Sequence, residues 1–354
     1  MSKKSYRVIQ WATGTVGKAS LRHFIENPTF ELVGVLVTNP AKVGKDAGEL
    51  VGLSPTTGVL ATNDVEKIIA LNADCVHYAP LVADVDTICR LLRSGKNVAS
   101  VGGPFSPEHY PAKFEKIEAA CKDGGVSYHA CGIHPGFSGD ILPLTLARLM
   151  NRIDRIEVTE FIDKVKNPMI YTEVMGFGRD PDALLAKPSR SAEAPFAFAQ
   201  SMAMVAEGLG KKLEKLTTKL EVAKATKDIP YSVGVGLPIS GVIRQGTVAG
   251  QHYEWTAWAD GAPLIIYHFY WTMGENVEPK WDIDSRYQVV IEGDPPLEVK
   301  LTGRPDANGD RPFLGLPWTG LLGATALPAV CDAKPGVVTH IELGVVQPRG
   351  LVRR

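Results

Sequence analysis

Apolar runs of strand length alternate with amphipathic helical segments over the first 145 or so residues. Helical patterns occupy residues 17–27, 63–72, 85–96 and 114–125. The strand-like runs between them are YRVIQWA (6–12), FELVGVLVT (30–38), ADCVHYAP (73–80), NVASVGG (97–103) and VSYHACGI (126–133). This alternation predicts parallel strands with right-handed crossovers, and therefore an α/β, doubly wound parallel sheet of the Rossmann type.

The pattern changes beyond residue 140. A helix is expected over 141–151, a strand over 152–163 and a mostly helical, Ala- and Met-rich segment from about Asp182 to Leu220. Residues 227–301 are strand-like with turn residues between the runs, which is typical of an antiparallel sheet. The fold class is therefore the Rossmann domain plus a second α+β domain on an open mixed or antiparallel sheet. The tail, with a helix and a Pro-Gly turn within 323–339, is expected to return to the first domain.

A glycine-containing turn separates the first strand from the first helix. It reads Ala12-Thr13-Gly14-Thr15-Val16-Gly17, close to the G-x-G-x-x-G fingerprint of dinucleotide-binding folds. Alanine in the first position requires a negative φ there. Gly14 would let the backbone approach a pyrophosphate, Gly17 would let the helix pack on its strand, and the amides of residues 15–17 would face the phosphates. The alternative is a tight strand-to-helix turn without a ligand.

The end of the second strand indicates which dinucleotide is bound. NAD enzymes usually place an acidic residue there, whereas this chain has Thr38, Asn39 and Lys42. A hydroxyl, an amide and a cation suit a 2′-phosphate, so NADP is the expected cofactor and NAD a second one. Lys42 as a solvated loop residue is the alternative. The three ranges are therefore expected to be an NAD(P)-binding domain (1–145), a substrate and dimerisation domain (146–310) and the returning segment (311–354).

Composition excludes several classes of protein. The 354 residues are 45% hydrophobic and 22% charged, with a net charge of −1, which disfavours nucleic acid and anionic membranes as partners. The longest apolar window is too short for a membrane span, and the start does not have the pattern of a signal peptide. Five scattered cysteines suit reduced thiols in the cytoplasm.

The segments VIQWATGTVGK, TNPAKVGKDAGEL and CGIHPGFSGD together resemble the dihydrodipicolinate reductase-like superfamily. Within it, the chain is most similar to the group of 2,4-diaminopentanoate dehydrogenase and related NAD(P)-dependent amine dehydrogenases. The resemblance covers most of the chain and is strongest over the first 145 residues. It implies a homodimer, an active site in the cleft between the domains, and hydride exchange with a C=N or C=O carbon.

The resemblance also implies roles for particular residues. Gly14, Thr15, Val16 and Gly17 match the pyrophosphate loop, and Thr38, Asn39 and Lys42 match the pocket for the adenosine ribose. Ala79, Pro80 and Leu81 correspond to the stretch along the nicotinamide ribose. Thr13 and Gly102 are expected to be further cofactor-binding residues. The GIHPGF segment matches a G-x-N-P-G-F turn, with His134 in place of the asparagine.

One departure from the family bears on the chemistry. The amine dehydrogenases carry a pair of glutamates soon after the strand that corresponds to NVASV, and one of them activates the amine or ammonia. Here residues 102–111 read GGPFSPEHYP, and the glutamate pair is missing. The glutamate of this segment, Glu108, lies some residues further along the chain than the pair would. Carbonyl reduction and reductive amination therefore both stay open.

Two residues are candidates for the catalytic proton. His134 lies in a Pro-Gly turn at the C-terminal end of a parallel strand, where open α/β sheets bind ligands. It would donate a proton or anchor the nicotinamide amide; a turn histidine bonded to local backbone is the alternative. Glu108 would need its pKa raised by burial, and a solvated loop residue is the alternative there. Cys131 and His134 have C-x-x-H spacing but no second pair nearby, which excludes a structural zinc site.

The segment IIYHFYWTM places Tyr267, Phe269 and Trp271 on one face of a strand and His268 and Tyr270 on the other. One face would line an apolar pocket, pack on helices or contact a second copy. The expected function is that of an NAD(P)H-dependent oxidoreductase acting on a small, fairly apolar carbonyl or amine substrate. The alternative is a catalytically silent dinucleotide sensor or structural relative.

Overall fold

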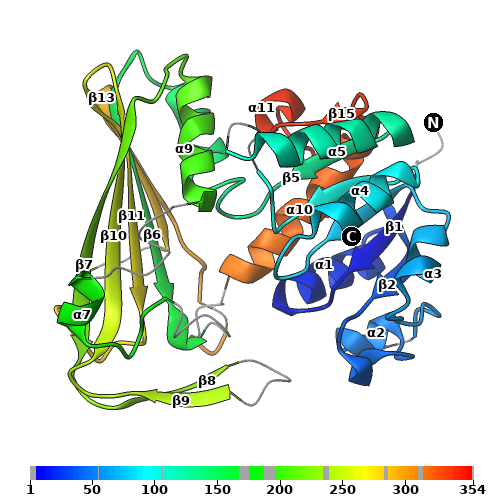
Figure 1. Cartoon of the computed structure of the whole chain (residues 1–354), viewed down its shortest axis with the longest axis horizontal. Helices are drawn as coiled ribbons and strands as arrows, with labels where there is room; N and C mark the ends of the chain where they lie inside the picture. Colours follow the sequence, from blue (N-terminus) through cyan, green and yellow to red (C-terminus); the bar gives the residue numbers. More distant parts are fainter. Residues whose placement is uncertain are drawn as a thin grey trace. The chain divides into compact units, whose positions relative to one another are not determined.

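The computed structural model describes residues 5–54, 56–105, 107, 109–166, 175–186, 196–233, 239–282, 286–305, 307–309 and 314–352 (Figure 1). The chain divides into two compact units. One contains residues 1–137 and 314–354, and the other contains residues 138–313. The C-terminal segment therefore folds with the N-terminal unit. The nucleotide-binding, substrate-binding and dimerisation roles expected of the three ranges stay predictions.

The first unit is built on a six-stranded sheet in the order β15-β5-β4-β3-β1-β2, with all strands parallel. The order reverses next to β1, and ligands bind at the C-terminal strand ends near such a reversal. The strands are β1 (Tyr6–Trp11), β2 (Phe30–Leu36), β3 (Cys75–Tyr78), β4 (Asn97–Ser100), β5 (Ser127–Ala130) and β15 (Gly336–Val337). The helices are α1 (Thr15–Glu26), η1 (Pro40–Lys42), α2 (Ala47–Leu50), α3 (Val65–Ala70), α4 (Val85–Arg93), α5 (Pro111–Gly124), α10 (Gly315–Asp332) and α11 (His340–Leu343).

Both faces of this sheet are covered by helices, because successive side chains of a buried strand point to opposite faces. Ile9 of β1 packs in a cluster with residues of α3, α4 and α5, such as Leu91. The neighbouring Val8 packs on the other face with Phe24 of α1 and Leu327 of α10. The predicted Rossmann-type sheet is therefore confirmed.

The second unit is built on a seven-stranded sheet in the order β12-β7-β10-β11-β6-β13-β14. Its strands are antiparallel except for the pair β11 and β6, so the sheet is mixed, as the predicted fold class states. The strands are β6 (Arg152–Asp163), β7 (Lys215–Ala225), β10 (Val248–Ala259), β11 (Ala262–Thr272), β12 (Val277–Glu278), β13 (Tyr287–Asp294) and β14 (Leu297–Leu301), with a separate ribbon of β8 (Ile229–Val233) and β9 (Ile239–Ile243). The helices are α6 (Ile141–Ala147), η2 (Lys164–Lys166), α7 (Pro181–Ala186) and α9 (Phe196–Gly208).

One face of this sheet carries the core of the unit. Tyr267, Phe269 and Trp271 are at most 5% exposed there. Phe198 of α9 lies over them, with its ring centroid 4.2 Å from that of Phe269 and 5.2 Å from that of Trp255. Three alternatives were expected for this aromatic face: an apolar pocket, packing on helices, or contact with a second copy. The described residues show that it packs on a helix.

The prediction of a mostly helical segment from Asp182 to Leu220 is wrong for its last residues. α7 and α9 are helical, but Lys215–Leu220 form the first half of β7 and pair with β10. Residues 187–195 of this segment lie outside the described residues. Leucines at 213, 216 and 220 have helical spacing, and lysine favours helices, but an available sheet edge overrides such local preferences.

Candidate functional site

The turn between β1 and α1 presents free backbone amides. The first helical hydrogen bond of α1 runs from the Lys18 amide to the Gly14 carbonyl at 2.8 Å. The amides of Thr15, Val16 and Gly17 therefore precede the helical ladder and have no helical carbonyl to bond. The N-cap Gly14 offers no side-chain cap, and the first turn has no acidic residue. These donors, together with the helix dipole, favour an anion at this position.

The two glycines of the turn serve different purposes. A Cβ on Gly17 would lie 2.1 Å from the Ala12 carbonyl oxygen, so only glycine lets α1 pack this closely on β1. A Cβ on Gly14 would meet nothing within 4 Å, and its φ of −70° suits any residue. The fold itself therefore does not require glycine at position 14. The open space beside the free amides fits a pyrophosphate that must approach the backbone closely.

The backbone conformation of Ala12 differs from the one that the sequence analysis expected. Its φ is +70°, whereas the sequence argument required a negative value. This left-handed conformation costs an L-residue about 1–2 kcal/mol. The Gln10 side-chain amide donates a 2.8 Å hydrogen bond to the Ala12 carbonyl, and the Ser20 hydroxyl donates to Gln10 at 2.9 Å. This buried pair holds the strained turn in place, a role that the sequence argument missed.

Lys42 lies beside the turn, as expected for a residue of the nucleotide site. Its ammonium donates to the carbonyl oxygen of Thr13 at 2.8 Å and to the Thr13 hydroxyl at 3.1 Å. Burial lowers the pKa of Lys42, and the positive charge of Lys18 lowers it further. Neither lysine forms an ion pair in the part of the chain that the structure describes. Lys18 was missed, although it directly follows Gly17 in the sequence.

Asn39 and Thr38 are exposed after β2. The Asn39 side-chain oxygen accepts a 2.9 Å hydrogen bond from the Ala41 amide and caps η1. Its side-chain NH₂ group then stays a donor for other acceptors. The capping bond fixes the short helix that carries Lys42.

The residues expected along the nicotinamide ribose lie together. The Ala79 amide donates to the Trp11 carbonyl at 3.0 Å, which joins the ends of β3 and β1. A Cβ on Gly102 would lie 3.3 Å from the Pro80 carbonyl oxygen, so the loops after β3 and β4 are in contact. Leu81 is 63% exposed, which leaves its side chain available to a ligand.

His134 lies in a tight turn after β5. Gly136, with a φ of +126°, closes this turn, since a Cβ there would lie 2.4 Å from the Gly132 amide nitrogen. The Ile133 amide bonds the Thr319 hydroxyl of α10 at 3.4 Å. The His134 side chain is half-buried. Within the six-stranded sheet, β4 and β3 separate β5 from β1. The other catalytic candidate, Glu108, lies outside the described residues.

The second unit contains a buried lysine that the sequence argument did not single out. Lys164 follows β6 and is 7% exposed, and its ammonium lies 4.6 Å from the centroid of the Trp271 ring. Burial lowers the pKa of Lys164 to about 8; the charge of Glu160 opposes this shift and that of Arg286 adds to it.

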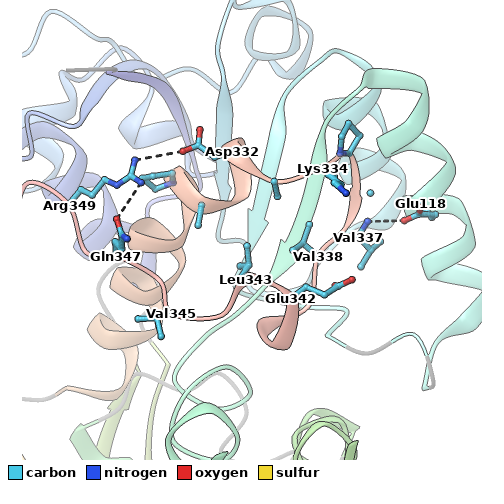
Figure 2. A pocket seen from close by; sticks show the side chains of 15 residues that line it. Glu118, Asp332, Lys334, Val337, Val338, Glu342, Leu343, Val345, Gln347 and Arg349 are labelled. Atoms are coloured by element: carbon cyan, nitrogen blue, oxygen red, sulfur yellow. Dashed lines mark hydrogen bonds and ion pairs between the residues drawn. The ribbon is translucent and has the colours of Figure 1, made fainter. Parts of the chain in front are cut away.

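A groove of about 630 Å³ lies along the C-terminal segment of the first unit (Figure 2). Its lining combines an ion pair between Asp332 and Arg349 (3.7 Å) with a 2.8 Å hydrogen bond from the Val337 amide to Glu118. None of the predicted site residues lines it. Among the described residues there is neither a His, Cys, Asp and Glu cluster that could hold a metal nor a helix with the length and apolarity of a membrane span.

Comparison with known proteins gives relatives that include an amine dehydrogenase and dihydrodipicolinate reductases. No family model matches the chain. An amine dehydrogenase from Streptomyces virginiae is 29% identical over 358 residues, which cover 95% of each chain. A 4-hydroxy-tetrahydrodipicolinate reductase from Mastigocladus laminosus is 34% identical over 73 residues, or 21% of this chain and 26% of that one.

Solved structures agree in fold. The amine dehydrogenase from Mycobacterium smegmatis matches with a TM-score of 0.79 at 18% identity, over 98% of both chains. The scyllo-inositol dehydrogenase from Lactobacillus casei, solved with NAD(H) and scyllo-inositol, matches with a TM-score of 0.59 at 12% identity, over 96% of this chain and 93% of that one. The chain is thus similar over nearly its whole length to an amine dehydrogenase and over a shorter stretch to dihydrodipicolinate reductases, which confirms the predicted resemblance and supports an NAD(P)H-dependent oxidoreductase.

Proposed function

We propose that this chain is an NAD(P)H-dependent oxidoreductase that exchanges hydride with a small, fairly apolar C=O or C=N substrate, by carbonyl reduction or reductive amination. The observation that carries the proposal is the start of α1, where the amides of residues 15–17 lack helical partners beside an open Gly14. The similarity to an amine dehydrogenase over 95% of the chain supports the same reaction class.

The cofactor site would use the following residues of the first unit. The amides after Gly14 would bond the pyrophosphate, and Thr38 and Asn39 would contact the adenosine ribose. Lys18 and Lys42 form no described ion pair, so a 2′-phosphate would supply their missing counter-charge. We therefore propose NADP as the preferred cofactor, with NAD as the second.

The nicotinamide end would lie against the loops after β3, β4 and β5. Ala79, Pro80, Leu81 and Gly102 would follow the ribose, and His134 would orient the carboxamide or the substrate. A bound reduced nicotinamide supplies the hydride, so the tasks of the protein are to position both reactants and to supply a proton.

We further propose a cytoplasmic homodimer that contacts through the outer face of the seven-stranded sheet. The described cysteines are free thiols, which suits a reducing compartment. On the outer face, His252 bonds Glu221 at 3.0 Å and His268 at 3.2 Å, and it stacks on Tyr270 at 4.1 Å. His252 is itself only 8% exposed, so the parts of this cluster that reach the surface are the exposed Glu221 and the half-buried His268 and Tyr270. A rigid polar and aromatic patch of this kind suits a contact between copies. Sedimentation at several protein concentrations tests the dimer.

Turnover is tested by following NADPH absorbance with butanone, cyclohexanone and pentanal, each with and without ammonium. Oxidation of NADPH without ammonium supports carbonyl reduction, and oxidation that depends on ammonium supports amine dehydrogenase activity. Binding of NADPH without turnover on any of the panel contradicts the enzymatic proposal and favours a dinucleotide sensor.

A further inference from the structure

Two cysteines that are far apart in the sequence pack on the same face of the six-stranded sheet. Cys75 begins β3 and is fully buried, and Cys331 lies near the end of α10. Cys75 shares a buried cluster with Val8 of β1 and Leu327 of α10, and Cys331 packs against that cluster. Ala324, Leu327 and Cys331 are three and four residues apart, a spacing that places them on one side of a helix. Cys331 therefore continues the side of α10 that packs on the sheet.

Two further contacts hold α10 close to these strands. The Tyr6 hydroxyl of β1 donates to the carboxylate of Asp332, whose two oxygens lie 3.0 and 2.9 Å away. A Cβ on Gly323 of α10 would lie 2.6 Å from Nε2 of His77 in β3, so this close approach of helix and strand requires glycine. Because β1 and β3 are parallel neighbours, their amino ends lie at the same edge of the sheet. The last turn of α10, which carries Cys331, is thus held at the edge where β3 begins.

The two thiols are in contact but differ in exposure. The Cys75 thiol hydrogen-bonds the Cys331 sulfur. Burial raises the pKa of Cys75 well above its usual range, and the hydrogen bond raises it further, so Cys75 stays protonated at neutral pH. Cys331 is partly exposed, whereas the other four cysteines of the chain are buried. An oxidant in solution therefore reaches Cys331 before any other cysteine.

We propose that Cys75 and Cys331 are an oxidisable pair, which forms a reversible disulfide between β3 and α10 on exposure to hydrogen peroxide. The thiolate of Cys331 attacks one peroxide oxygen, the O–O bond breaks, and the sulfur becomes a sulfenic acid while the second oxygen leaves as water. The thiol of Cys75 then displaces the hydroxyl group of the sulfenic acid, which forms the S–S bond and releases a second water. Two thiols thus lose two electrons in total, and one peroxide gains them.

The disulfide would join the two chain segments that form the first unit. Cys75 lies in residues 1–137 and Cys331 in residues 314–354, with the second unit between them in the sequence. A disulfide that closes so long a loop stabilises a protein mainly by restricting its unfolded chain. A thiol reductant would break it again by exchange, as is typical of redox-sensing disulfides in reducing compartments. This proposal does not depend on the proposed function.

The first test identifies the bond. The full-length protein is treated with hydrogen peroxide, its remaining thiols are blocked with iodoacetamide under denaturing conditions, and its peptides are analysed by mass spectrometry without reductant. A linked pair of peptides that contain Cys75 and Cys331 is expected, and dithiothreitol should remove it. The number of free thiols should fall by two from the five in the sequence. Oxidation of Cys331 beyond the sulfenic acid while Cys75 stays free, or no linkage between these two, would overturn the proposal.

The second test measures what the bond does. Oxidation of wild type is expected to raise the melting temperature by at least about 5 °C, and dithiothreitol should reverse the rise. Cys331→Ser and Cys75→Ala should each abolish this response. Because Cys75→Ala also changes the core, each variant is compared with its own reduced form. Cys121→Ala is the matched control, since Cys121 is a fully buried thiol of α5 in the same unit, and it should respond as wild type does.

The Cys75→Ala variant also tests the order of the two steps. Without its partner thiol, Cys331 is expected to stop at the sulfenic acid, which dimedone labels, whereas oxidised wild type should give little label. If oxidation leaves the melting temperature of wild type unchanged, or raises that of Cys331→Ser equally, the proposal is wrong. Dimedone labelling of a buried cysteine in place of Cys331 would contradict it as well.

Discussion

The ammonium of Lys42 donates hydrogen bonds to the backbone carbonyl (2.8 Å) and the hydroxyl (3.1 Å) of Thr13, joining the loop after β2 to the turn before α1. The two loops that would hold the adenosine and the pyrophosphate are thereby linked by a single cation. Lys18 is close enough for its charge to lower the pKa of Lys42 further. An anion bound here would relieve this repulsion.

Lys42→Ala is expected to raise the Kd for NADPH by about 10- to 100-fold and the Kd for NADH much less, because hydrogen bonds to charged groups contribute about 1.5–3 kcal/mol. Fluorescence titration with both nucleotides measures this difference. Lys45→Ala is the control, since Lys45 is exposed and pairs with Glu49 at 2.8 Å. An equal loss for both nucleotides would contradict a role in binding the 2′-phosphate.

Ala12→Gly is expected to stabilise the protein by up to about 1 kcal/mol, because glycine adopts a φ of +70° without strain. Denaturant unfolding measures the change. The reverse exchange, Gly125→Ala at the end of α5 with a φ of +65°, should destabilise by a similar amount. Destabilisation by Ala12→Gly would show that the turn does not have the described conformation.

Asp46 makes the loop after η1 sensitive to acid. Burial by itself would raise its pKa, but hydrogen bonds from the amides of Thr57, Gly48 and Gly58 outweigh this effect and lower it. A lowered carboxyl pKa means that the stabilisation is complete above about pH 4 and is lost as the pH falls further.

Asp46→Asn is therefore expected to lower stability at neutral pH by about 1–3 kcal/mol, and the gap from wild type should shrink below pH 4. Glu49→Gln, at an exposed ion pair, should change little. Unfolding curves across this pH range test the prediction, and a gap that stays constant down to the lowest pH would contradict it.

Sequence periodicity predicted the elements of the first unit well, because buried parallel strands and amphipathic helices leave strong local patterns. At the start of α3, Asp64 caps the helix by accepting from the Lys67 amide at 3.0 Å, as an aspartate directly before a helical pattern favours. The edge strand β15 and the parallel pair of β6 and β11 join distant segments, and no local pattern encodes such pairing.

The site was only partly predictable for the same reason. The glycine turn has a sequence signature, but the positive φ of Ala12 does not. The burial of Lys164 likewise has no signature in the sequence DKVKN. Burial depends on the neighbouring strands, which the sequence does not place.

The most direct test of the account compares wild type with Gly14→Ala in two measurements. A fluorescence titration gives the Kd for NADPH, and thermal unfolding gives the melting temperature of each free protein. A methyl group at position 14 has open space in the free protein and would enter the space assigned to the pyrophosphate. The account predicts unchanged melting and a Kd for NADPH raised at least about tenfold. The account would be contradicted if wild type showed no binding at millimolar NADPH, or if Gly14→Ala bound NADPH as tightly as wild type does.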